Sequence, residues 1–178
     1  MLTYILLLAY LIHQLEEHLG DRFRRFLNTY LGGGAEVLTP RATMLINVGE
    51  VWVLSLVVIL LAGLVDVGFG LIVAYTTLLN ALTHVVVAVV QRRYNPGLWT
   101  ALVCFIPLGV WALLAIGHAS GLGWAGHVIG VAVAVLGHAV ILMVVLRRLR
   151  ATRSANDGQS LGLFMLPPPR SSAPASQG

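Results

Sequence analysis

Long apolar runs alternate with short polar segments along this chain. Five of the runs are long enough to cross a hydrocarbon core of about 30 Å as helices, which takes roughly 20 apolar residues each. The pattern predicts an all-α membrane helix bundle with five transmembrane helices. They are expected at about residues 2–20, 43–64, 68–90, 97–117 and 124–146.

The polar segment between the first two runs has a helical period of its own. Its large side chains fall on one face and arginines on the other, which predicts an amphipathic helix lying at the membrane interface. Glycines at 32–34 end it. The large side chains are Phe23, Phe26, Leu27, Tyr30 and Leu31.

Two regions are expected. Residues 1–147 form the membrane helix-bundle domain. Residues 148–178 are rich in Ser, Pro, Gly and Ala and lack a sustained apolar period, so they predict a disordered cytoplasmic tail.

Composition supports an integral membrane protein. The 178 residues are 58% hydrophobic and 10% charged, with a mean hydropathy of +0.87, which is far from a soluble domain. All 11 basic residues are arginine, and the net charge of +4 does not indicate nucleic-acid binding. Cys104 is the only cysteine, so an intramolecular disulfide is excluded.

The arginines mark one side of the membrane. They flank the first and third connections and the C-terminal end, whereas the second and fourth connections have none. The positive-inside rule then predicts a multi-pass protein of the cytoplasmic membrane, with its N-terminus outside and its C-terminus in the cytoplasm. The marking residues are Arg22, Arg24, Arg25, Arg41, Arg92, Arg93, Arg147, Arg148, Arg150 and Arg153.

Ionisable residues on four of the predicted spans share one depth. Counted from the nearest cytoplasmic arginine, each lies eight or nine residues inward, or roughly 12–14 Å along a helix. These residues are His13, Glu50, His84 and His138. Because an ionisable side chain facing lipid costs about 2.5–3.5 kcal/mol, they are expected to converge inside the bundle.

Neighbouring polar residues extend the set on the same helix faces. His13, Glu16 and Glu17 stand at i, i+3 and i+4, and Asn80 and His84 at i and i+4. Pooled imidazoles and carboxylates suit one or two divalent metal ions, zinc or iron. The predicted metal ligands are His13, Glu16, Glu17, Glu50, His84 and His138.

Three further residues are predicted to assist binding. Asn80 is expected to support the ligands, and Arg93 and Tyr94 at the rim suit a phosphate or carboxylate head group, or else anchor the interface. His18 and His127 stay open as additional members of the site.

The stretch "HQLEEH" resembles the HXXEE family of small bacterial integral membrane proteins, through His13, Glu16 and Glu17. A second block of the family matches at Asn80, His84, Arg93, Tyr94, Pro96 and Gly97. The resemblance covers most of residues 1–147. It implies a bacterial membrane protein and supports the sites, but it carries no settled activity that could be transferred.

Several functions use such a site. A metal-dependent enzyme acting on a lipophilic substrate by hydrolytic or Lewis-acid chemistry, with Glu17 or Glu50 as general base, is favoured. A carboxylate-rich di-iron oxidoreductase, a metal-free acid–base isomerase or cyclase, and a non-enzymatic ion or proton pathway remain alternatives. The expected partners are the lipid bilayer and the substrate; a homo-oligomer is left open.

Overall fold

A computed structural model describes residues 2–30 and 32–164, without the side chains of residue 50 and of residues 155–164. Leu31, predicted on the apolar face of the amphipathic segment, therefore lies outside the described residues, as does the side chain of Glu50. Over the described ranges the chain forms helices joined by turns, with no strand. The all-α prediction is confirmed.

The helices follow the predicted segments closely. The described elements are α1 (Leu2–His18), α2 (Arg22–Tyr30), α3 (Pro40–Ile46), η1 (Asn47–Val53), α4 (Leu54–Leu64), η2 (Val67–Gly70), α5 (Leu71–Gln91), α6 (Leu98–Thr100), η3 (Ala101–Phe105), α7 (Ile106–Ala119) and α8 (Trp124–Phe164). Consecutive pieces join into continuous helices over 40–64, 67–91 and 98–119. Each predicted apolar run thus corresponds to one helical segment.

Four of these segments are long and apolar enough to cross a membrane. They are Pro40–Leu64, Val67–Gln91, Leu98–Ala119 and Trp124–Ser154. The first helix, α1, has 17 residues and falls just short of the same length criterion. The chain is therefore compatible with a membrane protein, and the count of five spans stays a prediction.

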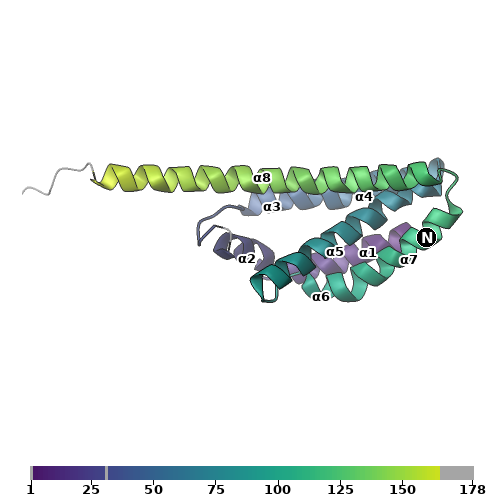
Figure 1. Ribbon diagram of the computed structural model, residues 1–178, viewed down its shortest axis with the longest axis horizontal. Coiled ribbons are helices and arrows are strands. Elements are labelled where there is room, and N and C mark those ends of the chain that lie inside the picture. Colours follow the sequence, from purple (N-terminus) through teal and green to yellow (C-terminus); the bar gives the residue numbers. More distant parts are fainter. Residues whose placement is uncertain (1, 31, 165–178) are drawn as a thin grey trace, which may run out of the picture.

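Helix α5 lies at the centre of the bundle and packs against both α7 and α8. In Figure 1, α8 runs along one side of the molecule while α5, α1 and α7 cross beneath it. The main core joins α1, α4, α5 and α7 through residues such as Leu6, Val58, Leu71 and Ile116. Gly130 of α8 approaches Leu71 and Tyr75 of α5 so closely that a Cβ would clash, and small residues commonly allow helices to pack at such short distances.

Two helices contain a π-helical stretch. In α6–α7, Pro107 lies two residues after the end of η3, and proline has no N–H and crowds the carbonyl four residues earlier. The Ile106 N–H instead bonds to the Ala101 carbonyl, five residues back. The second stretch, η1, begins at Asn47. Such wider turns commonly occur at functional sites, because they redirect side chains.

Helix α8 is longer than the sequence pattern predicts. It was expected to end near residue 146 but continues to Phe164, so residues 148–164 are helical. No proline occurs before Pro167 to stop it. In Figure 1 this extension projects beyond the other helices. The rest of the predicted tail, 165–178, lies outside the described residues.

Asp66 joins two connections at one end of the bundle. Its carboxylate accepts hydrogen bonds from the Gly68 N–H at 2.6 Å, the Ser120 hydroxyl at 3.1 Å and the Gly121 N–H at 3.0 Å. The Gly68 bond is the largest effect that holds the pKa of Asp66 below its usual range. Asp66 is thus a structural link between 65–70 and 119–122.

This link predicts a pH-dependent effect on stability. A carboxyl group with a lowered pKa in the folded state stabilises the fold above its unfolded pKa of 3.8 and loses that contribution as pH falls through the lower folded value. We therefore expect Asp66→Asn to lower the melting temperature in detergent at pH 7 by a few degrees. The difference from wild type should shrink below pH 4; a constant difference would contradict an ionised Asp66.

Candidate metal centre

Three buried side chains from two helices place one ligand atom each around a common point. The Glu17 Oε1 atom lies 3.5 Å from His13 Nε2 and 3.2 Å from His84 Nε2. All three ligand atoms lie within 4.8 Å of one another. His13 and Glu17 come from adjacent turns of α1, and His84 comes from α5. The three residues are 1%, 6% and 5% exposed.

Asn95 determines how the His84 ring is oriented. Its Nδ2 donates to the His84 carbonyl at 2.9 Å, which leaves Oδ1 to accept from His84 Nδ1 at 2.7 Å. A proton on Nδ1 leaves Nε2 of a neutral ring with a lone pair. This lone pair is directed at Glu17. Asn95 is itself 1% exposed, so water does not compete for these bonds.

Thr100 orients His13 in the same way. The Thr100 hydroxyl lies 2.6 Å from Glu16 Oε2 and 2.7 Å from His13 Nδ1. An ionised carboxylate only accepts, so the hydroxyl donates to Glu16 and accepts from the Nδ1–H of His13. The His13 Nε2 atom then carries a lone pair, and it has no hydrogen-bond partner in the described structure. The ring also stacks on Phe105, with centroids 4.4 Å apart.

The three convergent atoms are therefore all acceptors when both rings are neutral. Two imidazole lone pairs and a carboxylate oxygen meet without a donor, which is unfavourable in a buried site. A divalent cation satisfies all three. Metal–ligand bonds of about 2.0–2.1 Å in a tetrahedral site separate the ligand atoms by roughly 3.3 Å, close to the two observed distances.

Gly97 packs against both imidazole rings. It has a positive φ of 99°, and a Cβ at this position would lie 2.5 Å from His84 Cε1 and 2.8 Å from His13 Cε1. The turn that carries Asn95 and Gly97 therefore closes over the ring edges. Only glycine combines this backbone conformation with this close approach.

Glu16, one of the predicted metal ligands, lies outside the group of His13, Glu17 and His84. Its two oxygens accept from the Tyr94 hydroxyl at 2.7 Å, the Trp99 N–H at 3.2 Å, and the N–H and hydroxyl of Thr100 at 2.8 and 2.6 Å. Glu16 thus caps the start of the α6–α7 helix, which has no capping side chain of its own. Consecutive residues on α1 are rotated by about 100°, so Glu16 and Glu17 contact different elements.

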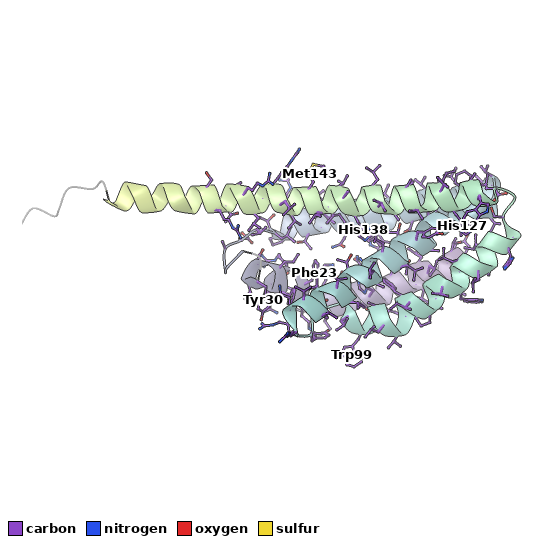
Figure 2. The ribbon with its side chains drawn as sticks, in the orientation of Figure 1. Phe23, Tyr30, Trp99, His127, His138 and Met143 are labelled. Atoms are coloured by element: carbon purple, nitrogen blue, oxygen red, sulfur yellow. The ribbon has the colours of Figure 1, made fainter. Side chains whose placement is uncertain are left out.

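The other predicted ligands lie around the group rather than in it. His138 of α8 donates from Nδ1 to the Ala134 carbonyl at 3.0 Å and lines the adjoining cavity. Figure 2 shows it on the side of α8 that faces the other helices, opposite Met143. Asn80 also lines the cavity, and its Oδ1 is buried without a partner. Glu50 stays a prediction, because its side chain is not described.

Arg93 and Tyr94 do not face this cavity. The Arg93 guanidinium stacks on the Tyr30 ring at 4.4 Å, which holds α2 against the end of α5. Tyr94 donates to Glu16, and burial followed by the Glu16 carboxylate raises the pKa of Tyr94 to about 12. Both residues line a separate groove with Trp99, and their predicted contact with a head group stays a prediction.

Two histidines left open by the sequence are now placed. His18 Nε2 lies 3.6 Å from Glu17 Oε2 and accepts from Asn47 Nδ2 at 2.9 Å, so it borders the group. His127 lies at the far end of the bundle and bonds to the Tyr75 hydroxyl at 2.9 Å (Figure 2). His127 is thus separate from the candidate site.

The two residues that orient the imidazoles were not predicted from the sequence. Asn95 belongs to the turn "YNPG", and Thr100 is one of several threonines in or beside apolar runs. An Asn-Pro pair is typical of a turn, and turns are usually exposed, so the sequence does not indicate that the Asn95 side chain is buried. The only clue was that this turn directly follows the helix of His84.

The comparisons with known proteins agree with the motif. A sequence profile described as "protein of unknown function with HXXEE motif" matches residues 4–112, which is more than half of the chain. The chain belongs to the HXXEE family. No match was found among curated proteins or among solved structures.

The matched range contains every ligand of the candidate centre. His13, Glu17 and His84 all lie within residues 4–112, as do Asn95 and Thr100, which orient the imidazoles. Helix α8, with His127 and His138, follows the matched range. In this HXXEE protein, the motif residues His13 and Glu17 belong to the buried group, whereas Glu16 caps a helix.

Proposed function

We propose that this protein is a membrane-embedded, metal-dependent enzyme whose single divalent cation is held by His13, Glu17 and His84. One observation carries the proposal: the Nε2 atoms of His13 and His84 and a Glu17 oxygen converge in a buried site, where two neutral rings would leave no donor between them. Two histidines and one glutamate form a ligand set used by hydrolytic zinc enzymes, in which a fourth position stays open.

The arrangement of the helices supports the proposal that five of them span the membrane. The N-terminus lies near the connection between α7 and α8, at the end that carries the arginine-poor turns (Figure 1). Helices α1 and α5 pack together along their length, so α1 belongs to the bundle although it is short. We propose that the N-terminus is outside, that the arginine-rich end faces the cytoplasm, and that α2 lies at that interface.

One ion suits the described ligands better than two. Di-iron bundles use several carboxylates that bridge the metals, whereas the buried group contains a single carboxylate, Glu17. The oxygens of Glu16 are already bonded to residues 94–100. This favours hydrolytic or Lewis-acid chemistry over oxygen activation.

When bound, the ion would polarise a carbonyl or lower the pKa of a water molecule. Asn95 and Thr100 would keep the two imidazoles neutral at Nε2 and correctly directed. Since Glu17 serves as a ligand here, the general base would be another group. His138, which lines the cavity, and Glu50 are the proposed bases for a lipophilic substrate.

Metal analysis of the protein purified in detergent tests this function. Wild type should contain about one zinc or iron ion per chain, and His84→Ala should contain less than a tenth of that. His127→Ala is the matched control, because it removes a partly buried histidine far from the group.

A well-folded wild-type protein with only background metal would contradict the proposal. It would then favour a proton shared between His84 and Glu17, whose 3.2 Å separation also suits a charged hydrogen bond. Loss of metal in His127→Ala as well would mean that the measured ion is bound elsewhere.

A further inference from the structure

A cavity of about 190 Å³ adjoins the candidate metal centre. By this measure a single water needs roughly 10–15 Å³, so the cavity has room for a ligand group or many waters. Apolar side chains of α2, η1 and α8 form much of its wall, among them Phe23, Phe26, Val51 and Ile141. His13, Glu17 and His84 lie at one part of the same wall.

The cavity contains no described cationic side chain other than its histidines. None of the arginines in the described ranges lines it, and Glu17 is the only carboxylate among its described lining residues. A phosphate or carboxylate head group inside it would find no guanidinium partner among the described lining residues, so only the proposed metal ion would balance its charge.

Two polar side-chain atoms of α5 beside the cavity have no hydrogen-bond partner in the described structure. Thr76 and Asn80 both line it, and Thr76 Oγ1 and Asn80 Oδ1 are buried without any hydrogen bond in the described structure. Thr76 is 7% exposed. With His84 they stand four residues apart on one face of α5, so the stripe spans about 12 Å. Asn80 Oδ1 is an acceptor, so its partner must be a donor.

We propose that this cavity binds a long-chain, uncharged alcohol, which deepens the proposed function by naming its substrate class and rests on that function. A hydroxyl group is both a donor and an acceptor. Its O–H donates to Asn80 Oδ1, and its oxygen accepts from the Thr76 hydroxyl, one turn away on the same face of α5. An ester, an ether or an ionised carboxylate only accepts and leaves Asn80 Oδ1 unpaired.

The apolar chain of the ligand fits an opening on the side of the bundle. Thr83 lines the cavity and is also exposed on the outer face of α5. In a membrane this face contacts lipid, so an alcohol dissolved in the bilayer reaches the cavity without crossing water. Phe23, Phe26 and Leu27 of α2 then cover the ligand from the arginine-rich end.

Photolabelling tests the assignment. Wild type in lipid nanodiscs is labelled with a long-chain primary alcohol carrying a diazirine, and the labelled peptides are identified by mass spectrometry. Label should fall on residues that line the cavity. The unlabelled alcohol should compete at least tenfold better than its fatty acid, alkyl phosphate or methyl ester.

The variants are chosen to remove one hydrogen-bond partner of the alcohol each. Asn80→Leu and, independently, Thr76→Val should weaken labelling about tenfold. Thr77→Val is the matched control, because the Thr77 hydroxyl is equally buried and unpaired but does not line the cavity. Having both Asn80 and Thr76 variants keeps the test valid if one of them does not fold.

The outcomes separate this inference from the proposed function when metal is measured in the same samples. Bound metal with no labelling in the cavity, or with equal competition by the fatty acid, overturns the alcohol assignment alone. Labelling unchanged in both Asn80→Leu and Thr76→Val also overturns it. Specific labelling of a protein with background metal supports the alcohol site and contradicts the metal-dependent enzyme.

Discussion

Glu17→Gln should remove the proposed metal ion, whereas Glu16→Gln should leave it in place: this is the sharpest result expected from the HXXEE motif. The first substitution puts a neutral amide where the buried group has its only carboxylate. Loss of a direct ligand should weaken metal affinity by more than about a hundredfold, beyond the effect of losing an outer partner. Metal content and competition with a chelator measure this difference.

The neighbouring variant is the internal control. Glu16 accepts four hydrogen bonds from residues 94–100, so Glu16→Gln should lower the melting temperature while an amide oxygen still accepts from part of that set. Loss of the ion in both variants, with both folded, would show that Glu16 acts at the metal. Retention in both would remove Glu17 from the ligand set.

Gly97→Ala should also abolish metal binding, although residue 97 supplies no ligand atom. The added Cβ would meet His84 at 2.5 Å and His13 at 2.8 Å, so one or both rings must move by several tenths of an ångström. A tetrahedral site tolerates ligand-distance errors of only about 0.2 Å. We expect a loss of affinity comparable to that of Glu17→Gln.

Gly34→Ala separates the clash from backbone strain. Gly34 has a φ of 94°, close to the 99° of Gly97, and no atom lies within 4 Å of its Cβ position. Both variants therefore strain the backbone by about 1–2 kcal/mol. Metal binding should survive in Gly34→Ala. Normal metal content in folded Gly97→Ala would contradict the close approach of the two rings.

Two independent patterns in the sequence predicted His13, Glu17 and His84. Helical spacing put His13 and Glu17 on one face of α1, and counting from the arginines put His84 at a similar depth. Depth gives the position of a residue along the helix axis, but it does not give the direction in which the side chain points around that axis. His138 has the same depth, yet it borders the cavity and is not in the three-residue group.

Glu16 shows the limit of helical spacing. At i+3 and i+4 from His13, both glutamates belong to the same broad face, so periodicity treats them alike. The choice between them depends on what α5 and α6 bring near: the His84 ring faces Glu17, and the Thr100 N–H and hydroxyl face Glu16. The Thr100 contacts join residues 84 positions apart in the chain.

Apolar periodicity and the arginine pattern alone were enough to predict an all-helical chain, its helical segments to within a few residues apart from the C-terminal extension of α8, and the three residues of the buried group. These properties depend on local spacing and on the cost of exposing polar groups to lipid. Only the tertiary structure decided that Glu17 and not Glu16 meets the imidazoles, that Asn95 and Thr100 orient them, and that Gly97 closes over them. Each of these features depends on the angles and contacts between helices. The spacing of residues along a single helix does not determine them.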